Sequence, residues 1–281
     1  MHIVNGRSVD QKSADQSSAN QISVYDRGLL YGDGVFRTMR ASAGQILHWS
    51  RHYQKLQQDC TRLNMACPSA ALLGEEMQPL LQQHSNGVAK IIITRGQQIE
   101  RGYRPAPNAV PTRILSISPL HSYPETFYTQ GVKLRVCQLR LAHQPLLAGV
   151  KHLNRLENVL AAAEWNDAEI AEGIMLDMAG SVIEGTRSNL FAVRAGILYT
   201  PSLAHCGVAG VQRDRVIEWA AKHGVTCKIE QFSLTELLAA DEIFLVNSLI
   251  GLWPVRELRE KTWHQFPVSQ KIQEWLNHAD N

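Results

Sequence analysis

The chain has 281 residues, with 28 basic and 26 acidic side chains and a net charge of +2, and 44% of its residues are hydrophobic. A chain of this length can bury a large core and fits two small domains better than one. The balanced charge excludes the basic stripe that nucleic-acid binding requires. No apolar run approaches the roughly 18 residues of a membrane span, so we expect no membrane partner.

The five cysteines are odd in number, scattered along the chain, and include no CxxC pair. This usage favours a reduced, cytoplasmic protein over a disulfide framework. The first residues lack a basic segment followed by an apolar core, so we expect no signal peptide.

The first part of the chain shows strand and helix patterns without strict strand–helix–strand repeats. Asn5-Gly6 predicts a hairpin between two short strands, and the polar stretch 10–21 predicts a loop. Strands are expected at 2–4, 7–9, 35–39, 45–47, 88–94 and 112–117, and helices at 49–63 and 72–83. This order indicates an α+β half.

A change of composition and two prolines between Ser118 and Pro124 indicate a domain boundary. We therefore expect a small α+β domain at 1–119 and a larger domain at 120–281, in which 139–150 connects to Lys151. In the larger domain, strands are expected at 133–138, 174–177, 182–184, 189–194, 197–200, 226–231, 242–246 and 249–252. Helices are expected at 156–167 and 211–223, and a capping box at 233–236 opens a shorter one.

Lys151 stands at a junction between extended chain and helix. It follows a small, flexible Ala148-Gly149 turn, and apolar residues then recur at spacings of three and four from Leu153 to Leu160. Most single lysines are solvated surface charges. The significance of Lys151 therefore depends on the residues that follow it.

The residues downstream of Lys151 supply what a pyridoxal phosphate enzyme needs. An aldehyde cofactor needs an amine that holds it as a Schiff base and later serves as base and acid, the role expected of Lys151. Its pyridine nitrogen needs a carboxylate, which Glu184 can present from a short strand. Its phosphate needs a helix start, which the Gly207–Gly210 loop provides, and a hydroxyl such as that of Ser248. Taken singly, the glycine loop is an ordinary turn and Glu184 a solvated residue, so the prediction depends on the set.

A series of motifs runs through nearly the whole chain. The motifs are Asp26-Arg-Gly28, Tyr31-Gly-Asp-Gly-Val-Phe36, Thr94-Arg-Gly96, Arg101-Gly-Tyr103, Lys151-His-Leu-Asn-Arg-Leu-Glu157, Glu184-Gly-Thr, Ser188-Asn-Leu-Phe191, Gly210-Val-Gln-Arg-Asp214, Ala240-Asp-Glu242 and Pro254-Val255. In these motifs the chain resembles the fold-type IV pyridoxal phosphate enzymes, which include the branched-chain and D-amino-acid transaminases. It resembles most closely the bacterial 4-amino-4-deoxychorismate lyases of folate synthesis.

The resemblance implies a two-domain α+β fold with a pseudo-barrel sheet in the larger domain, a homodimer, and pyridoxal 5′-phosphate as cofactor. It also implies that Lys151 is the Schiff-base lysine and Glu184 the partner of the pyridine nitrogen. The phosphate ligands it implies are the backbone at Val211 and Gln212, together with Ser248. The family's further phosphate-binding arginine is here Lys55, in the string His52-Tyr-Gln-Lys-Leu56, and a lysine is a flexible point charge rather than a bidentate fork.

The implied reaction is the elimination of pyruvate from 4-amino-4-deoxychorismate, which leaves 4-aminobenzoate. Arg101, with Tyr103 nearby, is the candidate for binding a substrate carboxylate, and it is equally compatible with a solvated loop arginine. Leu156 occupies the position of a tyrosine in the branched-chain transaminases, which counts against that branch. The alternatives are a D-amino-acid transaminase and a non-catalytic protein that keeps the fold.

His48 and His52 stand four residues apart on a predicted helix, which is a spacing found in metal sites. The sequence has no HExxH motif and places no cysteine or aspartate partner beside them. We therefore expect packing or surface histidines at these positions, and no metal.

Overall fold

The computed structural model describes residues 2–9 and 21–278, so nearly all of the predicted loop at 10–21 lies outside the described residues. The chain divides into two compact units. One contains the chain up to His121 together with Lys151–Asn154, and the other contains Ser122–Val150 and the residues from Arg155 onward. Among the described residues, no helix is long and apolar enough to cross a membrane.

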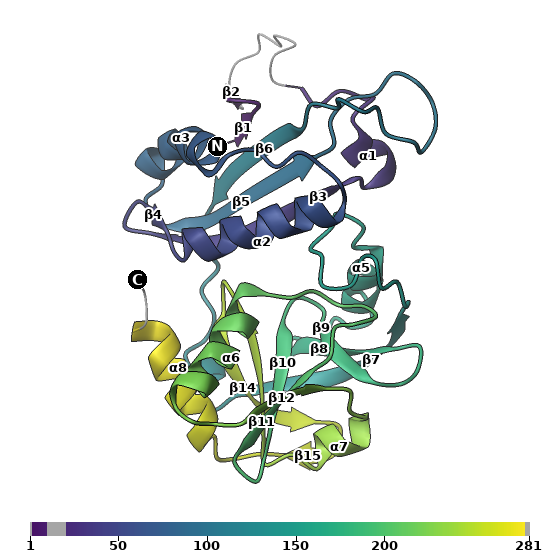
Figure 1. The fold of residues 1–281 in the computed structure, drawn as a ribbon. Coiled ribbons are helices and arrows are strands. Elements are labelled where there is room, and N and C mark those ends of the chain that lie inside the picture. Colours follow the sequence, from purple (N-terminus) through teal and green to yellow (C-terminus); the bar gives the residue numbers. More distant parts are fainter. Residues whose placement is uncertain (1, 10–20, 279–281) are drawn as a thin grey trace. The chain divides into compact units, whose positions relative to one another are not determined.

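The first unit contains a six-stranded sheet whose pairs are all antiparallel (Figure 1). The predicted hairpin is confirmed: Val4 pairs with Arg7, and Asn5 and Gly6 both have positive φ angles, of 48° and 80°, as a tight hairpin turn requires. In sheet order the strands are β2 (Arg7–Val9), β1 (His2–Val4), β6 (Thr112–Ser118), β5 (Gly87–Thr94), β3 (Gly34–Ser42) and β4 (Gln45–Ile46).

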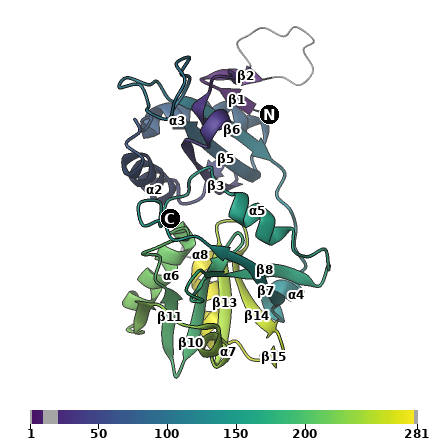
Figure 2. The same cartoon turned by 90° about the vertical axis from the view of Figure 1, so that its right-hand side faces the viewer.

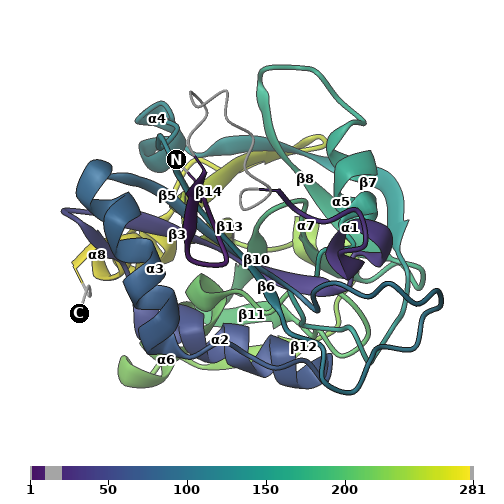
Figure 3. The same cartoon turned by 90° about the horizontal axis from the view of Figure 1, so that it is seen from above.

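The helices of the first unit are α1 (Arg27–Tyr31), α2 (Trp49–Arg62) and α3 (Ala70–Gln83). The predicted helices correspond to α2 and α3, and Figure 3 shows both from above. The buried residues of α2 recur at helical spacing and pack toward β3: His52, Leu56, Asp59 and Cys60. The short α1 was not predicted, although Asp26 caps it by accepting the N–H of Gly28.

The second unit contains a nine-stranded mixed sheet in which β11 and β12, β14 and β7, and β7 and β8 pair in parallel. In sheet order its strands are β12 (Cys227–Glu230), β11 (Ile197–Pro201), β10 (Asn189–Arg194), β13 (Glu242–Asn247), β14 (Gly251–Leu258), β7 (Val132–Leu141), β8 (Ile170–Asp177) and β9 (Val182–Gly185), and β15 (Lys261–Thr262) pairs with β14. Since β7 continues to Leu141, the connection toward Lys151 begins three residues later than the predicted 139.

Alternate residues of the central strands face two different apolar layers, as the twofold period of a strand requires. Phe191 of β10 and Phe244 of β13 pack with the helices α6 (Val211–Lys222) and α8 (Pro267–His278). Their neighbours Leu190 and Leu245 pack in a second apolar cluster with Val132 and Ile174 of β7 and β8. Figure 2 shows the strands of this sheet. The remaining helices are α4 (Thr126–Thr129), α5 (Leu156–Ala162) and α7 (Leu234–Leu238), the last opened by the predicted capping box.

The prediction of a helix over 156–167 was wrong at its end, because α5 stops at Ala162. The side chain of Glu164 accepts the backbone N–H groups of Gln138 and Leu139 at 2.7 and 2.8 Å, so the chain after the helix is fixed to the strand β7. The apolar residues whose spacing predicted this helix, such as Leu156 and Leu160, also do not face a core. Among the described residues of α5, only Ala161 is buried.

The strand predicted at 249–252 begins later, at Gly251. The side-chain oxygen of Asn247 accepts the N–H groups of Leu249 and Ile250 at 2.8 and 2.9 Å, which closes a turn. Gly251 then takes a positive φ of 66°. The helix α8 was missed, although Val268, Ile272 and Leu276 stand at the helical spacing that could have found it.

Candidate active site

In the first unit, hydrogen bonds fix the main chain of Lys151 on both sides of its side chain. Its N–H donates to Oδ2 of Asp59 at 3.2 Å, and its carbonyl accepts the N–H of Phe36 at 3.0 Å. The N–H of Leu153 donates to the carbonyl of Gly34 at 2.9 Å, so the segment continues along β3. The ammonium of Lys151 lies 4.5 Å from the centre of the Phe36 ring. A lysine attached to a fixed backbone can present its amine from a defined direction.

Asp59 lies in a cluster of mostly basic side chains on α2 and β3, which also contains Arg37, His52 and Lys55. It is 5% exposed and forms an ion pair with Arg37, which is 3% exposed. Burial raises the pKa of Asp59, while the nearby positive charges of Arg37 and Lys55 act in the opposite direction. Lys55, the residue that replaces the expected arginine, stands one helical turn before Asp59 and is half-buried. The structure therefore brings Lys55 and the main chain of Lys151 to the same carboxylate.

His52 belongs to this cluster and is buried, as the packing interpretation expected. Burial, followed by the charges of Arg37, His48 and Lys151, lowers its pKa to about 3. The imidazole is therefore neutral at physiological pH. His48 is the residue before α2, in the left-handed conformation with φ 56°.

In the second unit, Glu184 is attached to the loop that carries the glycines. Glu184 is 4% exposed on β9, and its Oε2 accepts the N–H of Val208 at 2.9 Å. Two backbone hydrogen bonds, of 2.9 and 3.0 Å, join Gly149 to residues 207 and 209 of the same loop. Gly149 lies two residues before Lys151 in the chain. The carboxylate and the chain that leads to the lysine are thus bonded to one loop.

The start of α6 has backbone N–H groups that no helical carbonyl accepts. Gly210 is the N-cap, and no side chain caps the helix. The N–H of Gly210 donates to Oδ1 of Asn189 at 3.1 Å, and Nδ2 of Asn189 donates to the carbonyl of Val208 at 2.8 Å. The N–H groups of Val211 and Gln212, at the first two helical positions, have no acceptor within the helix. This end of the helix suits an anion.

Asn189 lies at the start of β10 and is bonded to the glycine loop, and Ser248 directly follows the neighbouring strand β13. Asn189 opens β10 and pairs with Val246 of β13, and Ser248 follows two residues later, in the turn before β14. Asn189 was not predicted as a site residue. Its motif, Ser-Asn-Leu-Phe, was the signal that could have found it, because an amide side chain can both donate to and accept from a loop backbone.

The loop after β5 carries Arg101 and Tyr103, both exposed. The guanidinium of Arg27 donates to the carbonyls of Gly102 and Tyr103 at 3.2 and 2.7 Å and forms an ion pair with Asp33 at 2.8 Å. Arg27 of α1 therefore fixes this loop within the first unit. Its motif was noted in the sequence, but this positioning role was missed.

Comparisons with known proteins show the family of this chain. The family model "Amino-transferase class IV" matches residues 34–258. A protein of Vibrio harveyi, named aminodeoxychorismate lyase, is 40% identical over 231 residues, which cover 82% of this chain and 84% of that protein. A putative branched-chain-amino-acid aminotransferase of Methanocaldococcus jannaschii is 32% identical, over 91% of this chain and 86% of its own length.

A solved structure, that of 4-amino-4-deoxychorismate lyase from Pseudomonas aeruginosa, is 46% identical. It superposes with a TM-score of 0.92 over 99% of both chains. The chain therefore belongs to the class IV aminotransferase family and has its α+β, fold-type IV architecture, as the sequence predicted.

Proposed function

We propose that this protein is a pyridoxal phosphate-dependent lyase that converts 4-amino-4-deoxychorismate into 4-aminobenzoate and pyruvate. The observation that carries the proposal is the attachment of Glu184 and Gly149, two residues before Lys151, to one glycine loop. The names of the 40% and 46% identical relatives support the choice of a lyase.

The residues present fit the cofactor in their chemistry. Pyridoxal 5′-phosphate, when bound, supplies an aldehyde that an amine can hold and a ring that accepts electrons. We propose that Lys151 holds the aldehyde and that the carboxylate of Glu184 keeps the ring nitrogen protonated. The N–H groups of Val211 and Gln212 would bind the phosphate, since the start of α6 has no side-chain cap.

Lys55 and Ser248 complete the proposed phosphate ligands. Lys55 supplies a positive charge from α2, and this charge acts on the carboxylate of Asp59. As an ammonium on a flexible stem, it balances phosphate charge without fixing direction. In our proposal the backbone N–H groups of α6 therefore determine the position of the phosphate.

The proposed chemistry needs only one residue to move a proton. With the cofactor bound, the amine of Lys151 would take the proton from the amine-bearing carbon of the substrate. The bond between the neighbouring ring carbon and the enolpyruvyl oxygen would then break, a proton would return to the departing enolpyruvate to give pyruvate, and the ring would become aromatic. Because aromatisation drives this step, the enzyme has to orient the substrate and accept one proton. Arg101, with Tyr103, is the proposed partner of a substrate carboxylate.

We also propose that the protein is a cytoplasmic homodimer. We propose further that its first domain ends at residue 119 and its second begins at residue 120. Apolar side chains that face solvent support the dimer. On α5, Leu156, Val159 and Leu160 are 75%, 58% and 59% exposed, and on α1 Leu29 is 65% exposed. Exposed apolar side chains at neighbouring positions mark interaction surfaces. Sedimentation equilibrium of the cofactor-loaded protein measures the oligomeric state.

The test of function is to incubate the cofactor-loaded protein with 4-amino-4-deoxychorismate and to measure both products. We expect 4-aminobenzoate and pyruvate in equal amounts. The alternative, a D-amino-acid transaminase, would convert the cofactor to its amine form when D-alanine is added, which the absorbance spectrum detects. Conversion with D-alanine and no 4-aminobenzoate would contradict the proposal.

A further inference from the structure

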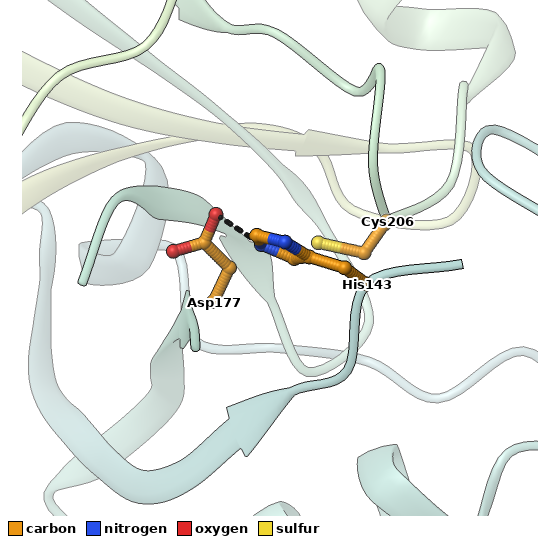
Figure 4. Close-up of side chains that lie close together, drawn as sticks. All are labelled: His143, Asp177 and Cys206. Carbon is orange, nitrogen blue, oxygen red and sulfur yellow. Dashed lines mark hydrogen bonds and ion pairs between the residues drawn. The ribbon is translucent and has the colours of Figure 1, made fainter. Parts of the chain in front are cut away.

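A histidine, an aspartate and a cysteine converge in the second unit, outside the residues assigned to the cofactor. Figure 4 shows His143, Asp177 and Cys206 with their side chains directed toward one another. Each can offer one ligand atom, and these three atoms all lie within 4.8 Å of one another. His143 follows β7, Asp177 ends β8, and Cys206 lies between β11 and α6, so the fold assembles the cluster from distant parts of the chain.

The imidazole and the carboxylate lie close to the separation of two zinc ligands. Nε2 of His143 lies 2.9 Å from Oδ2 of Asp177. Ligand atoms bound to zinc at about 2.0–2.3 Å lie roughly 3.3–3.8 Å apart in a tetrahedron. The imidazole and the carboxylate need to separate by only a few tenths of an ångström to admit an ion. With the sulfur of Cys206, they would form three ligands and leave a fourth position for water.

Hydrogen bonds already fix the carboxylate of Asp177, as they do for carboxylates that bind metals. Oδ1 of Asp177 accepts the N–H groups of Ala179 and Ser181 at 3.0 and 2.8 Å. Those hydrogen bonds fix the carboxylate and leave Oδ2 directed toward His143. Among the residues that the structure describes, neither lysine nor arginine forms an ion pair with Asp177, which is fully buried. A cation at this place would compensate a buried negative charge.

The charges of the three ligands match a divalent ion. A neutral imidazole, a carboxylate and a thiolate carry two negative charges, which balance the two positive charges of the metal. Zinc binds cysteine as the thiolate, so binding to a protonated thiol breaks the S–H bond and releases one proton per ion.

The cluster is reached by solvent at His143, and hydrogen bonds join the segments around it. The side chain of His143 is 37% exposed, while Cys206 is buried. The ring of His143 stacks on that of His205, with centroids 5.1 Å apart, and the carbonyl of His205 accepts the N–H of Gln144 at 2.8 Å. The segments that carry two of the ligands are thus bonded to each other beside the cluster.

We propose that His143, Asp177 and Cys206 bind one divalent metal ion of borderline softness, with Zn²⁺ the best match. Nitrogen, carboxylate and sulfur ligands together select zinc or cobalt, whereas Mg²⁺ and Ca²⁺ prefer oxygen ligands alone. The proposal does not depend on the reaction that the protein catalyses.

The experiment is equilibrium dialysis of the reduced, cofactor-loaded protein, without a histidine tag, against Zn²⁺. We expect one ion per chain, an affinity that rises with pH, and visible absorption bands of a tetrahedral site when Co²⁺ replaces Zn²⁺. His143→Gln and Cys206→Ser should each weaken binding at least about tenfold. Cys227→Ser, in the same unit but outside the cluster, is the matched control and should bind as the wild type does.

Two results would overturn the proposal. One is a wild-type protein that binds no stoichiometric Zn²⁺, and the other is equal binding by the wild type and His143→Gln. Because His143 is partly exposed, its variant should fold even if the buried Cys206→Ser variant does not. Thermal melting with and without Zn²⁺ provides a second measurement. The ion should raise the melting temperature of the wild type and of Cys227→Ser, and leave that of His143→Gln unchanged.

Discussion

Oδ2 of Asp59 lies 3.2 Å from the backbone nitrogen of Lys151, and the same carboxylate forms a buried ion pair with Arg37. One side chain on α2 thus fixes the main chain of the proposed catalytic lysine and neutralises a buried guanidinium. The position of Lys151 and the stability of the first unit are therefore linked through Asp59.

Asp59→Ala should reduce stability by about 3–5 kcal/mol, because it leaves the charge of Arg37 buried without its partner. It should also lower turnover, because the backbone of Lys151 loses an acceptor. Urea unfolding and steady-state kinetics measure the two effects. Glu75→Ala, at an exposed position of α3, is the control and should stay within about 0.5 kcal/mol of the wild type. Equal stabilities of the Asp59 and Glu75 variants would refute this account.

His52 should make the protein less stable in mild acid. Its pKa is about 3 in the folded protein, below its ordinary value of 6.5. As the pH falls below 6.5 the unfolded chain binds a proton that the folded chain does not, so the free energy of unfolding falls by about 1.4 kcal/mol per pH unit. This loss continues until the pH reaches the folded pKa.

His52→Gln removes that proton uptake. Between pH 6.5 and 5 the wild type should lose roughly 2 kcal/mol more stability than the variant. Denaturant unfolding at the two pH values measures the difference. His264→Gln, which changes an exposed histidine, should keep the slope of the wild type. A His52→Gln slope equal to that of the wild type would show that His52 is not held neutral.

Val211→Pro tests the proposed phosphate position with little change to the helix. Proline is tolerated at the first helical position, where it removes the N–H and here also replaces a buried valine side chain, and Gly210 has the φ of −74° and ψ of 153° that suit a residue before proline. We expect at least about tenfold weaker binding of pyridoxal phosphate, since a hydrogen bond to a charged group is lost. Binding of pyridoxal, which has no phosphate, should change little.

The matched control is Leu234→Pro, at the first position of α7. It makes the same backbone change at a helix to which no ligand is assigned. If both proline variants bound the cofactor as tightly as the wild type, the start of α6 would not be the phosphate site.

Arg101→Gln separates substrate binding from chemistry. If Arg101 binds a substrate carboxylate, KM should rise roughly tenfold or more, with a smaller change in kcat. Arg104→Gln, another exposed position of the same loop, should leave both constants near those of the wild type. An unchanged KM for Arg101→Gln would identify Arg101 as a solvated loop residue.

The sequence allowed the prediction of elements whose signals are local. The Asn5-Gly6 hairpin, the Ser233–Glu236 capping box and the amphipathic α2 each depend on neighbouring residues, and each is present. The end of α5 was misplaced because Glu164 bonds to the backbone of β7, far away in the chain. A contact between distant segments leaves no periodic signal in the sequence.

The same distinction applies to the candidate site. Lys151 and Glu184 could be selected from their motifs, because their chemistry is carried by their own side chains. Asp59 and Asn189 act on backbone groups of Lys151 and Val208, and nothing in the sequence pairs these positions. Positioning residues of this kind become visible only once the fold brings them together.

The most direct measurement is the yield of 4-aminobenzoate and pyruvate from 4-amino-4-deoxychorismate, compared between the wild type and Lys151→Ala. Both proteins should be saturated with pyridoxal phosphate, and Lys271→Ala, at an exposed position of α8 in the second unit, controls for the loss of a lysine elsewhere. We predict equal amounts of both products from the wild type and Lys271→Ala, and neither product above background from Lys151→Ala. Full turnover by Lys151→Ala would contradict the account.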